Sequence, residues 1–214
     1  MRKDTDIIKF LNGRRVVPYS HIMSLREKRD PHNIISQKGG QENALASDAD
    51  IVIAGGNRGG GKSWMLLLSM FYDIHDPNQC TLIVRKERDD LSNLVSKSEK
   101  LFGDFGTYNR SQDLMYWKLK AGGTISFSYH AGSLKAFQDR LQGREYNRIG
   151  IDEITQIDFP KFKYLQTNNR NAHGLHNQII GTCNPDPDSW VAKFIDWWIG
   201  EDGLPIKERD CVKR

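Results

Sequence analysis

A run of glycines that ends in a lysine and a serine is the part of this sequence best suited to bind phosphate. It spans Gly55 to Ser63 and, from Gly56, fits the pattern G-x-x-x-x-G-K-[ST]. Glycines let the backbone curl so that successive N–H groups point at phosphate oxygens, and a following helix adds its partial positive charge. We expect Lys62 to bridge the β- and γ-phosphates of a nucleotide and the Ser63 hydroxyl to bind Mg²⁺. The predicted binding loop comprises Gly56, Asn57, Arg58, Gly59, Gly60, Gly61, Lys62 and Ser63.

The segments on either side of this loop have the composition that it requires. Residues 51–54 form a short apolar, β-branched run typical of a buried parallel strand. Residues 64–71 have the length and residue types of a buried helix. Because strand, loop and helix come in the required order, we interpret the glycines as a nucleotide site rather than as a turn that matches by chance.

Two adjacent carboxylates, Asp152 and Glu153, follow a second apolar strand at 148–151. We expect this strand to lie beside the phosphate-loop strand, with its carboxyl end opening into the same crevice. Asp152 is then placed to hold Mg²⁺, and Glu153 to act as general base or to orient the attacking water. Carboxylates at a helix start, where they complement the helix dipole, are the alternative. The upstream phosphate loop favours catalysis, and together the two motifs predict an additional-strand, catalytic-glutamate type of P-loop ATPase.

Two further polar residues are candidates because of where they lie. Gln41 falls in a polar, glycine-rich stretch over 33–47, which predicts a loop before the first core strand. Its amide can donate to and accept from an adenine edge, although a solvated loop glutamine is the simpler alternative. Asn184 follows a predicted strand at 178–182, where it can sense the γ-phosphate or merely form a turn before Pro185.

The other segments alternate between strand and helix patterns. A strand and a charged helix are expected first, then a β-hairpin with a glycine turn, and then two helices, one capped by Ser133 and one amphipathic. A short helix is also expected near the N-terminus. In chain order these predictions cover residues 4–11, 81–84, 88–101, 115–119 with 124–129, 133–141 and 189–199.

Length and composition favour one soluble α/β domain. The chain has 214 residues and a net charge of +4, which permits contact with nucleic acid without arguing for it. Its 3 cysteines show no paired spacing, so we expect reduced thiols, and no apolar run approaches membrane-spanning length. His173 and His176 lie near Cys183 in sequence but lack a fourth ligand, so no zinc site is predicted.

Four segments of the chain resemble the N-terminal ATPase domain of the large terminase subunit of tailed bacteriophages, the motor that packages DNA. They are residues 39–42, 55–63, 141–155 and 181–198. The last two are the most family-specific, because Leu141-Gln142-Gly143-Arg144-Glu145-Tyr146 leads into the carboxylates and Thr182-Cys183-Asn184-Pro185 resembles the family's coupling motif. A generic helicase or AAA-type ATPase is not expected to combine them.

The resemblance implies a RecA-like α/β sandwich, in which a mostly parallel sheet carries helices on both faces. Residues 1–47 would form an N-terminal extension with the adenine-side loop, and residues 48–214 the P-loop ATPase core. It also implies roles for individual residues. Gln41 would contact adenine, Arg58 and Lys62 the phosphates, Ser63 and Asp152 the Mg²⁺, and Glu153 the attacking water, while Thr182 and Asn184 would couple hydrolysis to movement.

The function implied is hydrolysis of ATP, with Mg²⁺, to drive double-stranded viral DNA into a procapsid in the host cell cytoplasm. The implied partners are double-stranded DNA, the portal protein and the small terminase subunit. A homo-oligomeric ring would form on the portal, with a monomer in isolation and no membrane contact. The alternatives are another nucleic-acid-dependent motor of the helicase type, and a nucleotide-gated assembly module with little turnover when isolated.

The sequence departs from the family pattern in two ways. Many relatives carry an arginine before the glycine that matches Gly143, where it can act as a finger in the neighbouring subunit; here that residue is Gln142. Arg140 and Arg144 are the candidates to replace it, and Arg144 is favoured. The second departure is that the 214 residues of this sequence contain no counterpart of the family's ribonuclease-H-like nuclease domain. We therefore expect no nuclease activity from these residues.

Overall fold

A seven-stranded sheet forms the centre of the fold. The computed structural model describes residues 9–11, 14–16, 40–56, 59–110, 115–201 and 206. The strand order is β3-β9-β8-β4-β7-β6-β5. The first five strands in this order, from β3 to β7, run parallel to one another. Strand β6 pairs antiparallel with β7, and β5 pairs antiparallel with β6. The strands are β3 (Ile51–Gly55), β4 (Cys80–Arg85), β5 (Gly106–Arg110), β6 (Met115–Leu119), β7 (Thr124–Tyr129), β8 (Arg148–Ile151) and β9 (Gln178–Cys183).

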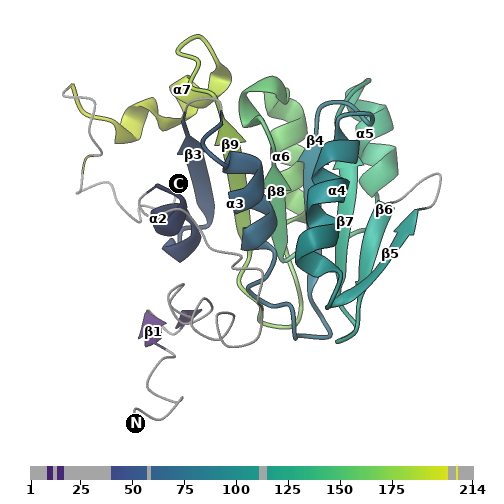
Figure 1. Cartoon of the computed structure of the whole chain (residues 1–214). Coiled ribbons are helices and arrows are strands. Elements are labelled where there is room, and N and C mark those ends of the chain that lie inside the picture. The colour runs from purple at the N-terminus through teal and green to yellow at the C-terminus, as the bar shows by residue number, and fades with distance from the viewer. Residues whose placement is uncertain are drawn as a thin grey trace.

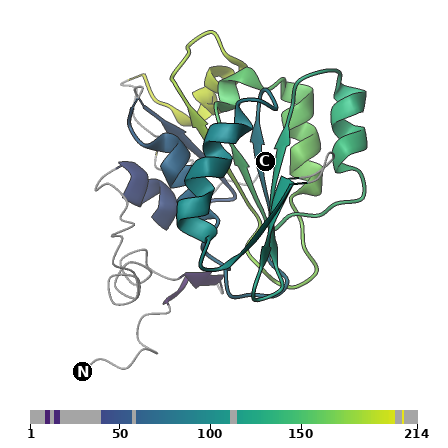
Figure 2. The same cartoon turned by 45° about the vertical axis from the view of Figure 1, so that its right-hand side comes forward.

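Helices cover both faces of this sheet (Figures 1 and 2). One apolar core lies between the sheet and α2, α3 and α4, and a second lies between the sheet and α5, α6 and α7. The helices are α2 (Gly40–Ala46), α3 (Lys62–Ser69), α4 (Leu91–Phe102), α5 (Leu134–Leu141), α6 (Phe159–Asn168) and α7 (Trp190–Ile195). The predicted fold class, a mostly parallel α/β sandwich, is confirmed.

The predicted position of the carboxylate strand was wrong in one respect. Strand β8 does not lie beside the phosphate-loop strand β3, because β9 is inserted between them and pairs with both. All six residues of β9 are buried, so this strand needs neighbours on both edges and a helix layer on each face. Asp152 therefore lies about 10 Å, two strand spacings, from the loop strand. The end of β9 fills the gap between them.

Two predictions about the N-terminal part were also wrong. The helix expected over 4–11 is contradicted at Lys9–Leu11, which forms strand β1 paired antiparallel with β2 (Arg14–Val16). The loop expected over 33–47 is contradicted at Gly40–Ala46, which form helix α2, because Gln41 and Leu45, one helical turn apart, are both buried. Residues 33–39 lie outside the described part of the chain.

Most other elements were predicted correctly, with shifted ends. Ser133 caps α5, its hydroxyl accepting a hydrogen bond from the Ala136 N–H at 3.2 Å, and β6 and β7 form the expected hairpin. The helix expected over 189–199 is α-helical only as far as Ile195 and then becomes a 3₁₀ turn. Strand β5 and helix α6 were not predicted. No helix in the described residues has the length and apolar character to cross a membrane.

Candidate functional site

The phosphate loop leaves strand β3 and turns directly into helix α3. Gly59 and Gly61 adopt positive φ angles of 83° and 68°, a conformation that L side chains rarely take. Gly61 stands at the N-cap position, so the first N–H groups of α3 face the loop. Asn57 and Arg58 lie outside the described residues, so their predicted contacts with phosphate stay predictions.

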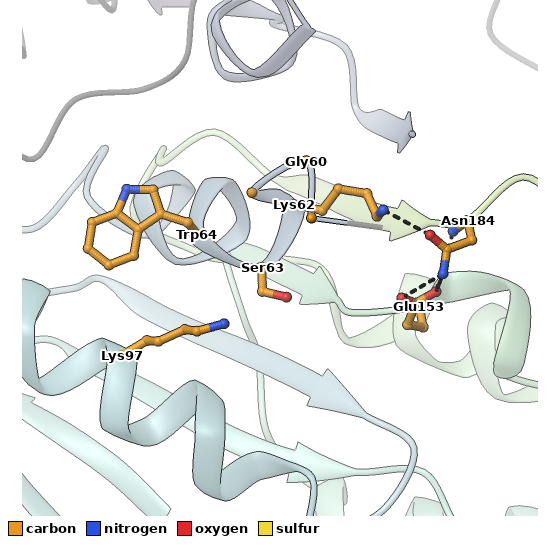
Figure 3. Close-up of a pocket in the computed structure, with 9 residues that line it drawn as sticks. Gly60, Lys62, Ser63, Trp64, Lys97, Glu153 and Asn184 are labelled. Carbon is orange, nitrogen blue, oxygen red and sulfur yellow. Dashed lines mark hydrogen bonds between the residues drawn. The ribbon is translucent and has the colours of Figure 1, made fainter. Parts of the chain in front are cut away.

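A pocket of about 280 Å³ opens over this loop. Figure 3 shows it, with Lys62 extending toward Asn184 on one side and Lys97 pointing toward Ser63 on the other. Lys62 Nζ donates hydrogen bonds to the Gly56 carbonyl at 2.8 Å and to Asn184 Oδ1 at 3.0 Å. The pocket is lined by Gly59, Gly60, Gly61, Lys62, Ser63, Trp64, Lys97, Glu153 and Asn184.

Asp152 and Ser63, the two predicted magnesium ligands, lie together although they are 89 residues apart. Ser63 Oγ lies 3.4 Å from Asp152 Oδ1 and donates a hydrogen bond to it. Neighbouring ligands of an octahedral Mg²⁺ ion are about 3 Å apart, since each bond is about 2.1 Å long, so this pair of oxygens fits the ion. Asp152 also accepts a hydrogen bond from Thr182 Oγ1 at 2.8 Å and pairs with Arg85 Nε at 3.5 Å.

Glu153 is the one non-glycine residue with positive φ in the described part of the chain, at 57°. Such backbone strain costs about 1–3 kcal/mol and gathers at functional sites. The Glu153 carboxylate accepts hydrogen bonds from the Asn184 side chain at 3.2 and 3.3 Å and from the Asn184 backbone N–H at 3.3 Å. Asn184 therefore joins Lys62 to Glu153 across the pocket (Figure 3).

The end of strand β9 holds these parts in place through three consecutive residues. Thr182 Oγ1 donates to Asp152 and accepts from the Glu153 N–H at 3.4 Å. The Cys183 carbonyl accepts a hydrogen bond from the Gly56 N–H at 3.2 Å, and Asn184 follows with the contacts described above. Burial raises the pKa of the Cys183 thiol, and the Glu153 carboxylate adds to the rise, so the thiol stays protonated and unreactive.

Gln41 reaches the phosphate loop from helix α2. It is buried, and its Nε2 donates a hydrogen bond to the Gly60 carbonyl at 2.9 Å. The side chain thus contacts the backbone of the phosphate loop. Its contact with adenine stays a prediction.

The family model for the terminase large subunit, T4likevirus-type, N-terminal, matches residues 53–212. This chain belongs to that family. Solved structures share its RecA-like fold at low sequence identity. The large terminase of the thermophilic bacteriophage D6E has a TM-score of 0.56 and 17% identity over 74% of this chain and 43% of its own. No curated protein matches this sequence.

Two other solved structures match this terminase chain over a larger share of their own length than the D6E protein does. The ATPase domain of the Thermus phage P74-26 large terminase has a TM-score of 0.55 and 17% identity, covering 78% of this chain and 72% of that one. The N-terminal domain of the DNA packaging ATPase of bacteriophage phi29 has a TM-score of 0.54 and 16% identity, covering 74% and 85%. By contrast, this chain spans about two fifths of the D6E protein.

The two candidates for an arginine finger differ sharply in this terminase chain. Arg140 Nη2 donates to the carbonyls of Tyr129 and Ala131 at 3.1 and 3.0 Å, and its guanidinium stacks 4.1 Å from the Tyr129 ring centre. These contacts hold Arg140 within its own subunit and argue against a role in a neighbour. Arg144 is exposed and precedes β8, at the opposite end of that strand from Asp152. Arg144 remains the predicted finger.

Three residues of the site were missed by the sequence analysis: Trp64, Arg85 and Lys97. Arg85 is the last residue of strand β4, which pairs with the strand that precedes Asp152. The sequence signal for Arg85 was therefore a basic residue at the carboxyl end of a predicted parallel strand. Lys97 lies three residues after Leu94 and four before Leu101, both buried, at the edge of the apolar stripe of α4. A lysine that borders this stripe is the signal for a charge facing the neighbouring helix.

Proposed function

We propose that this chain is the ATPase domain of a phage DNA-packaging motor. The observation that carries the proposal is the meeting of the phosphate loop with the paired carboxylates: Ser63 lies 3.4 Å from Asp152, and Asn184 links Lys62 to Glu153. The family match supports it, and so do structures of the D6E large terminase in complex with ADP and with ATP-gamma-S. The reaction is in-line attack of water on the γ-phosphate of ATP.

The residues of the site divide this reaction between them. Lys62 and the N–H groups at the start of α3 stabilise the negative charge that spreads over the phosphate oxygens. Ser63 and Asp152 would hold Mg²⁺, which when bound neutralises charge on the β- and γ-phosphates. Glu153 accepts a hydrogen bond from the attacking water and orients it. Arg58 is expected to add a further positive charge at the phosphates.

Asn184 gives a physical route from the nucleotide to the catalytic carboxylate. Its Oδ1 accepts from Lys62 Nζ, and its Nδ2 donates to Glu153. A γ-phosphate is a stronger acceptor for Lys62 than a neutral amide, so binding of ATP draws Lys62 away from Asn184. Asn184 is then released to move, and Glu153 with it. Thr182 and Asn184 would in this way couple hydrolysis to movement.

The wider assignment follows from the same proposal. Residues 48–214 form the ATPase core, and residues 1–47 an extension that contributes Gln41. The motor moves double-stranded DNA into a procapsid in the host cytoplasm, working with a portal protein and a small terminase subunit. It acts as a homo-oligomeric ring, in which Arg144 approaches the pocket of the next subunit.

The test is steady-state ATP hydrolysis by the unmodified chain, by Glu153→Gln and by the control Glu99→Gln. Glu99 is exposed on α4 and does not line the pocket. We expect Glu153→Gln to bind ATP normally and to lose about 10²–10⁴-fold in rate, with Glu99→Gln unchanged. Equal rates for Glu153→Gln and the unmodified chain would refute the catalytic role.

A nucleotide-gated assembly module is the second candidate, because the three hydrogen bonds from Asn184 hold Glu153 in this structure. The two are separated by the rate per subunit as protein concentration rises. A rate that climbs with concentration and falls in Arg144→Ala supports a motor completed by its neighbour. Bound nucleotide with no rate above the Glu153→Gln blank supports the module.

A further inference from the structure

Lys97 enters the pocket from a separate element, helix α4. Its side chain is partly buried and its amine points toward Ser63, across the pocket from Lys62 (Figure 3). Lys62 is held by Gly56 and Asn184, whereas no hydrogen bond or ion pair within the described part of the chain ties the Lys97 amine. A half-buried lysine without a partner keeps its full capacity to bind an anion.

The backbone beside Lys97 is rigidly placed. The neighbouring residue Ser98 is fully buried, and its hydroxyl accepts a hydrogen bond from Trp117 Nε1 at 2.9 Å. Leu94 and Leu101, on the same face of α4, are buried in the core that α4 shares with α3. The backbone from which Lys97 extends toward the pocket is therefore fixed by packing, and a ligand does not have to order the helix.

The charges that line the pocket favour a polyanion. Lys62 and Lys97 contribute two positive charges and Glu153 one negative charge, and Glu153 is engaged by Asn184. We propose that Lys97 is a second phosphate-binding lysine, which contacts the triphosphate of the bound nucleotide from the α4 side, near Ser63. The inference rests on the proposed function, because it assigns one more residue to the same nucleotide. It gives a role to the lysine that borders the apolar stripe of α4.

The proposal is tested by calorimetric titration of Mg·ATP-γ-S into the unmodified chain and four variants. Lys97→Met keeps the length of the side chain and removes its charge, and Lys97→Arg keeps the charge. Lys100→Met is the matched control, since Lys100 is exposed on the same helix and does not line the pocket. Lys62→Ala reports on the site itself.

Loss of one hydrogen bond to a charged group should weaken binding by about 10- to 100-fold in Lys97→Met. Binding by Lys97→Arg should stay within about threefold of the unmodified chain, because a cation still reaches the phosphates. Thermal unfolding of each variant confirms that the fold is intact.

Three results would overturn the inference. Equal affinities for Lys97→Met and Lys100→Met, with Lys62→Ala impaired, would remove Lys97 from the site and leave the proposed function standing. Equal losses in Lys97→Met and Lys97→Arg would show that the charge is not what matters. No binding of Mg·ATP-γ-S by the unmodified chain would overturn the proposed function and this inference together.

Discussion

Replacing Thr182 with valine removes a single hydroxyl from the centre of the site and leaves the shape of the side chain almost unchanged. Thr182 is fully buried, and its hydroxyl donates to Asp152 Oδ1 at 2.8 Å. The hydroxyl oxygen of Thr182 also accepts a hydrogen bond from the Glu153 N–H at 3.4 Å. Asp152 is itself 2% exposed, so water cannot replace the lost donor.

The size of the effect follows from the lengths of the remaining contacts. A hydrogen bond to a charged group contributes about 1.5–3 kcal/mol. The other two donors to Asp152, Ser63 at 3.4 Å and Arg85 at 3.5 Å, are too distant to take over its role. We therefore expect Thr182→Val to lower the free energy of unfolding by about 2 kcal/mol. Thr182→Ser keeps the hydroxyl and loses one methyl group, which costs about 1 kcal/mol.

Urea denaturation separates the two variants. With a slope of about 2.5 kcal/mol per molar urea, the midpoint of Thr182→Val should fall by about 0.8 M and that of Thr182→Ser by about half as much. In an Asp152→Asn background the added cost of Thr182→Val should shrink to about half, because a neutral acceptor forms the weaker bond. A valine variant as stable as the serine variant would refute the reasoning, since hydrophobic size would then outweigh the hydrogen bond.

Two further predictions concern stability outside the pocket. Burial, and then the nearby Lys161 ammonium, lower the pKa of His130 from 6.5 to about 4. As pH falls, His130 is protonated in the unfolded chain before it is protonated in the folded one. The free energy of unfolding should therefore fall by up to about 3 kcal/mol as pH drops from 6.5 to 4. In His130→Gln the free energy of unfolding should depend less on pH over this range. In Gly181→Ala the added Cβ would lie 2.5 Å from Ile154 Cδ1. It should cost about 1–3 kcal/mol in a denaturant titration, and Ile154→Val, which removes that atom, should recover part of the loss.

The local chemistry of this protein was present in the sequence. The glycines that end in Lys62 and Ser63 predicted both the loop and the start of α3, since a left-handed backbone and a helix N-terminus depend on residues that are adjacent in the chain. The same holds for the Ser133 cap of α5 and for the hairpin of β6 and β7, where short-range hydrogen bonds decide the structure.

The tertiary structure alone decided which distant residues meet. The order of the strands across the sheet depends on how the strands pack together, so no local sequence signal marked β9 as the strand between β3 and β8. This position of β9 is what lets Asn184 join Lys62 to Glu153. Packing against α3 and β3 made the segment of Gln41 a helix, because burial of Leu45 outweighs a weak local preference. Packing of α4 likewise brought Lys97 to the pocket, because the orientation of the helix decides which of its side chains line that pocket.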